Sequence, residues 1–144
     1  MTAKQYFEGV RLAERSLYLI RQQQRHTFEM ATKLSGPGAE QHIRSPNVHS
    51  GVENAGVRLA DLENDLQAQA DKYISQIGEA RQIINQLPQA RFREVLTLRY
   101  LCGHTWRTIS DEMDYADEKS VFRVHGRALQ AADAILKTFL TNTT

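Results

Sequence analysis

The stretch QARFREVLTLRYLCGHTWRTISDEMDYADEKSVFRVHGRAL, residues 89–129, decides the fold, because it contains consecutive helical patterns separated by turns. Its first pattern, residues 89–101, has apolar side chains at helical spacing among charged ones. The apolar positions available for burial are Phe92, Val95, Leu96 and Leu98, and the positions expected in water are Arg91, Arg93, Glu94 and Arg99. Gly103 then predicts a turn at residues 102–104, because glycine accepts a left-handed backbone at little cost.

The next two helical patterns begin at residues that cap helices well. Thr105 is a good N-cap for a short helix over residues 106–113. A second tight turn is expected at residues 114–116, and Asp117 can cap a final helix over residues 118–140. The inward positions of these two helices are expected to be Ile109, Met113, Val121, Val124, Ala128, Ala131, Ile135 and Phe139.

Before residue 88 the sequence shows two long heptad stripes. The first consists of Tyr6, Val10, Ala13, Leu17, Ile20, Gln24, Thr27, Ala31 and Leu34. The second consists of Ala55, Leu59, Leu62, Leu66, Ala70, Tyr73, Ile77, Ala80, Ile84 and Leu87, and Pro88 then ends or kinks the helix. One helix cannot cover its own stripe, so the two helices are expected to pair as an antiparallel hairpin, with a homodimer covering what remains exposed. Scaffold packing is favoured over a groove for a specific partner.

Residues 35–52, SGPGAEQHIRSPNVHSGV, are rich in Gly, Pro, Ser and Asn and predict a flexible loop. The expected fold class is therefore all-α: a long antiparallel, coiled-coil-like helical hairpin followed by a C-terminal helix-turn-helix. The expected domains are residues 1–87, which include the loop, and residues 89–144.

Two helices joined by a short turn, with the second placed to enter a major groove, define the helix-turn-helix. The outward face of the last helix presents Phe122 and Gly126 beside a line of cations four residues apart: Lys119, Arg123 and Arg127. Such cations can neutralise phosphates, and an arginine can donate two hydrogen bonds to guanine. The alternative interpretation of the cations is a solvated basic face. Gly126 inside a helix suggests close approach of another backbone, either protein or DNA.

The segments REVLTLRYL (residues 93–101), TWRTISDEM (105–113) and SVFRVHGRAL (120–129) together resemble region 4 of sigma-70-type factors. In those factors a leucine-rich helix, a support helix and a recognition helix bind a promoter element. With its long N-terminal helices included, the chain more closely resembles small phage and prophage proteins linked to the ArpU and RinA types of late transcriptional regulator.

The resemblance implies that the start of the support helix touches the DNA backbone and that the recognition helix contacts bases and phosphates. The DNA-binding residues expected on these two helices are Thr105, Trp106, Arg107, Glu118, Lys119, Ser120, Phe122, Arg123 and Arg127. The turn segment DYADEKS is one residue longer than the usual sigma pattern, and it places Asp117 and Glu118 where a serine and an arginine commonly stand. Sigma regions 2 and 3 are absent from the match, so the chain is not expected to open DNA as a complete sigma factor does.

Composition restricts the function without naming it. The chain is 41% hydrophobic and 24% charged with a net charge of +1, which is ordinary for a globular protein and requires any basic surface to be local. Cys102 is the single cysteine, so an intramolecular disulfide is excluded and a reducing compartment is favoured. The first residues, MTAKQYFEGVRLAERS, carry charges where a signal peptide needs an uninterrupted apolar core, and no apolar run approaches a membrane span. The expected location is the cytoplasm of a bacterial host, away from membranes.

No P-loop, dinucleotide-binding glycine pattern, nucleophile elbow or HExxH motif is present, so we expect no enzyme and no cofactor. Cys102 and His104 lie two apart, but no other histidine has zinc-site spacing around it, so no metal is expected. Trp106 is expected to pack in the small core, the alternative being a stack on a sugar-phosphate edge.

The leading hypothesis is a regulator that binds double-stranded DNA in a sequence-specific way, with the hairpin forming a homodimer or contacting bacterial RNA polymerase. A second hypothesis keeps the helix-turn-helix as a packing unit and makes the chain an interaction module for RNA polymerase or a host factor. A third is a small terminase subunit, although such subunits usually carry the DNA-binding part first.

Overall fold

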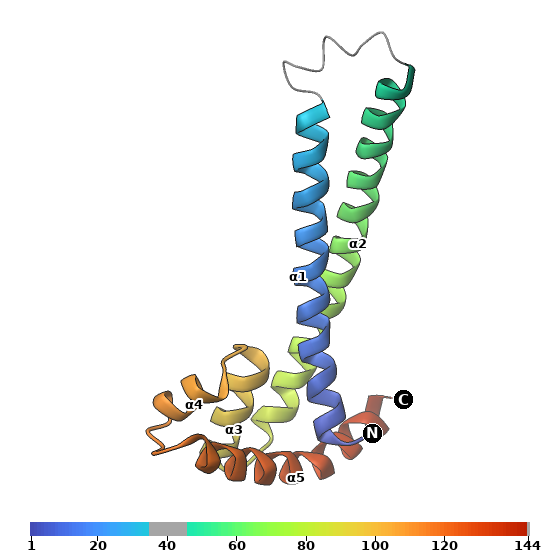
Figure 1. Cartoon of the computed structure of the whole chain (residues 1–144). Coiled ribbons are helices and arrows are strands. Elements are labelled where there is room, and N and C mark those ends of the chain that lie inside the picture. The colour runs from blue at the N-terminus through green and yellow to red at the C-terminus, as the bar shows by residue number, and fades with distance from the viewer. Residues whose placement is uncertain (35–45, 144) are drawn as a thin grey trace. The chain divides into compact units, whose positions relative to one another are not determined.

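The computed structural model describes residues 1–34 and 46–143, and within these ranges the chain is helical with no strand. Helices α1 (Ala3–Leu34) and α2 (Pro46–Asn85) pack antiparallel (Figure 1), which confirms the predicted all-α class and hairpin. Shorter elements follow: α3 (Ala90–Leu96), the π-helical turn η2 (Thr97–Leu101), α4 (Trp106–Glu112) and the longer α5 (Glu118–Thr143).

The loop predicted at residues 35–52 extends too far toward the C-terminus, because its last residues belong to a helix. Residues 35–45 lie outside the described residues, but α2 already begins at Pro46. Proline is well suited to the first position of a helix, because the amide hydrogen it lacks would have no partner there and its φ is already helical. The expectation that residues 46–52 form loop is therefore wrong.

By compactness the chain divides into two units. The end unit comprises Met1–Ala13 and Tyr73–Thr144, and the hairpin unit comprises Glu14–Lys72. The sequence predicted two domains, residues 1–87 and 89–144. Compactness does not test whether domains fold independently, so that division stays a prediction.

The end unit has one core that includes side chains from the first turns of α1. Its buried members from the long helices are Ala3, Phe7, Val10, Ala80, Ile83 and Ile84. Leu87, just after α2, is buried as well, and the members from the later elements include Val95, Leu96, Tyr100, Ile109 and Val121. Phe7 stacks on Tyr100 with ring centroids 5.1 Å apart. Burial of this kind is the main favourable contribution to folding, so the first turns of α1 stabilise the helices that end the chain.

Hydrogen bonds also fix the start of α1 in the end unit. The Thr2 hydroxyl accepts the Gln5 amide at 3.2 Å and the Gln5 side chain accepts the Thr2 amide at 2.9 Å, which is the reciprocal capping-box arrangement. The Ala3 amide donates to the Asp133 carboxylate of α5 at 2.6 Å. A carboxylate at a helix N-terminus complements its unpaired amides and its dipole.

In the hairpin unit the heptad stripes face each other but remain partly open to water. Leu17 and Ala55 are buried, whereas most other stripe positions are only half-buried: Ile20, Gln24, Thr27, Ala31, Leu59, Leu62, Leu66 and Ala70. Two helices alone cannot enclose a seam from every side. Apolar side chains also lie exposed on this unit: Tyr18, Leu19, Phe28, Met30 and Val57.

The helix predicted over residues 89–101 is not uniform. It runs as α3 to Leu96 and then widens into η2, where the Cys102 amide donates to the Thr97 carbonyl at 2.9 Å. In a continuous α-helix Arg99 would share the face of Phe92 and Val95, at spacings of seven and four. The wider turn instead brings Tyr100 to that face, where it is 1% exposed, and leaves Arg99 half-buried. The expectation that Arg99 lies in water is therefore wrong, and so is the same expectation for Arg93, which is half-buried and donates to the Leu87 carbonyl at 2.6 Å.

The buried face of α5 also changes along its length. Val121, Val124 and Ala128 are buried as predicted. Further along, the buried positions are Leu129, Ala132 and Leu136, whereas the predicted Ala131, Ile135 and Phe139 are only partly buried. No helix in the described part of the chain combines the length and the apolar character needed to cross a bilayer.

Candidate DNA-binding surface

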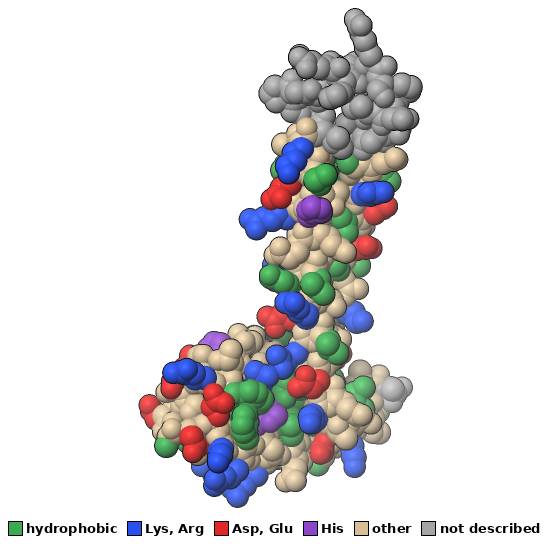
Figure 2. All heavy atoms as spheres, in the orientation of Figure 1, with side chains coloured by type: hydrophobic (Ala, Val, Ile, Leu, Met, Phe, Trp, Pro, Cys, Tyr) green, Lys and Arg blue, Asp and Glu red, His purple; other side chains and the backbone are tan. Residues whose placement is uncertain are grey.

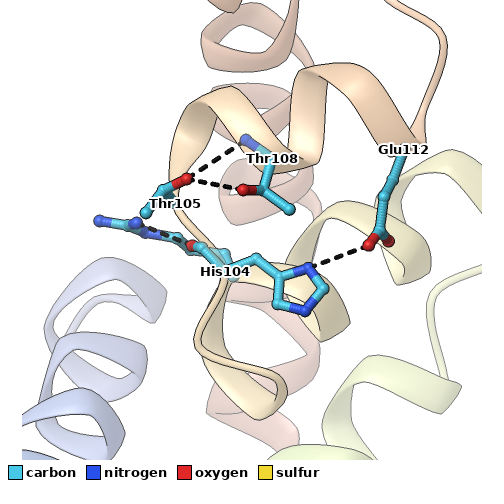
Figure 3. A network of polar contacts seen from close by, with 5 residues as sticks. His104, Thr105, Thr108 and Glu112 are labelled. Carbon is cyan, nitrogen blue, oxygen red and sulfur yellow. Dashed lines mark hydrogen bonds and ion pairs between the residues drawn. The ribbon is translucent and has the colours of Figure 1, made fainter.

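Helix α4 is fixed at its start by side chains of its own sequence. The Thr105 hydroxyl accepts the Thr108 amide at 3.2 Å and lies 2.9 Å from the Thr108 hydroxyl (Figure 3), which confirms the predicted N-cap. The His104 ring lies 3.4 Å from the Glu112 carboxylate at the other end of α4. An Arg99 guanidinium nitrogen donates to the His104 carbonyl at 3.0 Å and so anchors the turn before α4 to η2.

The turn between α4 and α5, residues 113–117, is ordered by backbone bonds. The Tyr115 amide donates to the Ser110 carbonyl at 2.9 Å, and the buried Ser110 hydroxyl donates to the Tyr115 carbonyl at 3.2 Å. Asp114 takes a left-handed backbone with φ 58°, a conformation that aspartate tolerates better than most residues. This closed turn fixes the direction in which α5 leaves α4.

Asp117 caps α5 as predicted. Its carboxylate accepts both the backbone amide and the hydroxyl of Ser120, each at 3.0 Å. These bonds, backbone first, hold the pKa of Asp117 below its usual value, and the nearby Lys119 and Arg123 act in the same direction. The carboxylate is therefore charged at neutral pH, at the end of α5 that is expected to approach DNA.

The first turns of α5 present a mixed but mainly basic surface. Lys119, Arg123 and Arg127 are all exposed, as are Glu118 and Phe122. In Figure 2 basic side chains project from the edge where Figure 1 places the first half of α5, with acidic side chains among them on the same face. Of the other predicted site residues, Arg107 is exposed, Thr105 is exposed but used in its cap, and Ser120 is half-buried against Asp117.

Trp106 links the two helices of this surface. It is half-buried, and its ring meets Phe122 edge to face at 5.2 Å between centroids and His125 at 4.7 Å. The Arg99 guanidinium lies 4.0 Å above the Trp106 ring. Trp106 thus packs within the protein, as the favoured of the two interpretations predicted.

The sequence did not point to Arg99, Tyr100 or His125 as members of this cluster. The Tyr100 hydroxyl lies 2.7 Å from Nε2 of His125, across a separation of 25 residues. Burial, followed by the positive charges of Arg99 and Lys4, lowers the pKa of His125 to about 4. Burial, followed by the negative charge of Glu8, raises the pKa of Tyr100 to about 12. Both rings are therefore neutral at pH 7, and the tyrosine hydroxyl can donate to an unprotonated Nε2.

Gly126 lies on the exposed face of α5, one turn after Phe122. A side-chain carbon built at Gly126 would meet no atom within 4 Å apart from its own helix. No other described part of this chain therefore approaches Gly126 closely. The close approach suggested by a glycine at this position would have to involve a separate molecule.

Within the described ranges, no group of three or more His, Cys, Asp or Glu side chains is arranged to hold a metal ion. Comparison with models of protein families, with curated proteins and with solved structures gave no match.

Proposed function

We propose that the chain is a sequence-specific DNA-binding regulator of transcription, of phage or prophage type, in which the first turns of α5 enter the major groove. One observation carries the proposal: Lys119, Arg123 and Arg127 are all exposed along one line of a helix whose start is fixed by α4, a closed turn and the Asp117 cap. A recognition helix needs both features, because cations bind phosphates and guanine while a rigid support sets the orientation of the helix.

The resemblance of residues 93–129 to sigma region 4, and of the chain to ArpU-type and RinA-type regulators, supports the same proposal. A regulator of this kind would act in the cytoplasm of a bacterial host. The near-neutral net charge of +1 agrees with a local contact surface rather than a generally basic protein. Affinity would then fall with added salt, with a slope set by the number of cations that contact phosphate.

We assign dimerisation to the hairpin unit. Its half-buried stripes can gain further burial from a second copy, and its helices differ in charge. Residues 14–33 of α1 carry four basic and two acidic side chains, whereas residues 53–72 of α2 carry two basic and five acidic ones. In a twofold dimer α1 of one copy can lie beside α2 of the other, so that opposite charges meet. A mass measurement in solution should give two copies, whereas a ring of many subunits would favour the terminase hypothesis.

The test of DNA binding uses duplexes selected by the full chain from a random pool. Arg123→Ala should weaken binding by about 1–3 kcal/mol if the guanidinium contacts a base, and Lys119→Ala should reduce the salt dependence by about one phosphate contact. Arg81→Ala, at an exposed position on α2 in the same unit, is the matched control and should bind as wild type does. Wild-type affinity for both Arg123→Ala and Lys119→Ala would show that α5 does not enter the groove.

A second function is favoured by one specific observation. Asp117 and Glu118 place exposed carboxylates at the start of α5, where they oppose a phosphate backbone. An interaction module that binds RNA polymerase or a host factor would tolerate them. Retention of purified RNA polymerase by the full chain, without retardation of any DNA from the random pool, would select this function.

A further inference from the structure

Phe122 is an apolar side chain in the middle of a charged surface. It lies in the second turn of α5 with 45% of its surface exposed, between the exposed Lys119 and Arg123. The neighbouring valines on α5, Val121 and Val124, are buried in the core. Folding therefore leaves Phe122 partly exposed to water on the face that we assign to DNA.

The phenyl ring is held from behind. The edge-to-face contact with Trp106, at 5.2 Å, supports it from α4, and Trp106 itself contacts His125 and the guanidinium of Arg99. Arg99 is in turn bonded to the His104 carbonyl. A side chain supported in this way loses little conformational freedom when it binds a partner, which favours a contact of defined geometry.

We propose that Phe122 contacts the 5-methyl group of a thymine and thereby selects thymine at one position of the DNA site. A phenyl ring has no donor or acceptor, so it cannot bind phosphate or the polar edge of a base. In the major groove the apolar group that a protein can contact is the thymine methyl, and phenylalanine is one of the side chains suited to it. Lys119 and Arg123 on either side can bind phosphate or guanine and direct the ring toward the base pairs.

This inference rests on the proposed function and deepens it, since it adds one determinant of sequence specificity. The probe is a duplex recovered from the random pool with the full chain, in which uracil replaces each thymine in turn. Uracil lacks only the methyl group, so the paired hydrogen bonds are kept. At one position we expect wild-type affinity to fall about fourfold, the cost of leaving one such carbon unburied. Phe122→Ala should bind the thymine and uracil duplexes equally.

Two further variants keep the test independent of folding defects. Phe122→Leu retains an apolar side chain and should still prefer thymine, and Ile74→Ala, which removes an exposed apolar side chain elsewhere in the end unit, should match wild type. If wild type binds DNA with no methyl preference, or if Phe122→Ala keeps the preference, this inference is overturned while the proposed function stands. If Phe122→Ala instead changes the mass in solution and leaves the preference intact, the ring contacts protein. Failure to bind any duplex overturns the proposed function itself.

Discussion

His125 in the end unit is uncharged at neutral pH, because burial lowers its pKa. Nε2 of its ring can accept a hydrogen bond from the Tyr100 hydroxyl, 2.7 Å away, and the ring packs against Trp106. Protonation would therefore place a positive charge in a partly buried site near Arg99. A protonated imidazole has no free lone pair, so it could no longer accept a hydrogen bond from the tyrosine. The aromatic cluster that supports Phe122 therefore depends on an uncharged His125.

The resulting prediction concerns stability against pH. The imidazole pKa is about 6.5 in an unfolded chain, and it is about 4 in the folded protein. Between these values the unfolded state binds more protons, so stability is fully present above pH 6.5 and is lost as the pH falls toward 4. After allowance for partial exposure the loss should be about 1–2 kcal/mol. Urea unfolding at several pH values should show a smaller loss for His125→Gln, and an equal loss would contradict the assignment.

At the scale of the element, the start of α5 combines a cap with an unfavourable charge. Asp117→Asn keeps an oxygen that can accept the Ser120 amide but removes the negative charge. We expect it to keep the stability of the fold and to raise DNA affinity, most clearly at low salt, because repulsion from phosphate is relieved.

Asp117→Ala is the matched comparison, because it removes both the charge and the cap. It should lower the thermal midpoint relative to Asp117→Asn. Midpoints from thermal unfolding and affinities from fluorescence anisotropy at two salt concentrations check both effects. If Asp117→Asn left DNA affinity unchanged at low salt, the start of α5 would not lie near phosphate.

Local sequence signals predicted most of the helices. The Thr105 and Asp117 caps, the turn at Gly103 and the heptad stripes depend on residues a few positions apart, so the sequence shows them directly. The π-helical turn is different, because the Tyr100 ring that it places on the buried face packs against Phe7, which is far away in the sequence. Helical periodicity describes one helix at a time and does not include such a neighbour.

For the candidate DNA-binding surface, the sequence predicted the exposed residues but not the contacts that support them. The exposed positions of Lys119, Arg123 and Arg127 follow from their spacing relative to Val121 and Val124. The contacts that support the surface from behind, from Arg99 and His125 to Trp106, join residues on three separate elements. Nothing in their local spacing distinguishes them from ordinary surface residues, and only the packed structure brings them together.

At the scale of the whole molecule, the end unit should unfold when α1 is weakened near its start. Phe7 is fully buried and stacks on Tyr100, so Phe7→Ala should cost about 3–5 kcal/mol of stability in that unit. Trp106 is the single tryptophan and lies in the end unit, so its fluorescence reports on that unit alone.

Phe28→Ala is the control for Phe7→Ala, because it removes the same ring from an exposed position of α1 in the hairpin unit. Its effect on the Trp106 transition should stay within about 0.5 kcal/mol. Circular dichroism follows the helices of both units and should show a second transition in Phe7→Ala if the hairpin unit outlasts the end unit. Equal shifts of the Trp106 transition in the two variants would contradict the role assigned to the start of α1.

The bond from the Ala3 amide to Asp133 joins positions 130 residues apart, and it has a consequence for biosynthesis. A ribosome adds about 5–20 residues per second, so the first turns of α1 wait roughly ten seconds before Asp133 exists. During that interval Phe7 and Val10 remain exposed, because the residues that bury them have not yet been made. The hairpin unit can already fold. The nascent chain therefore exposes an apolar helix end that chaperones can bind, and the surface that we propose for DNA binding forms only at the end of synthesis.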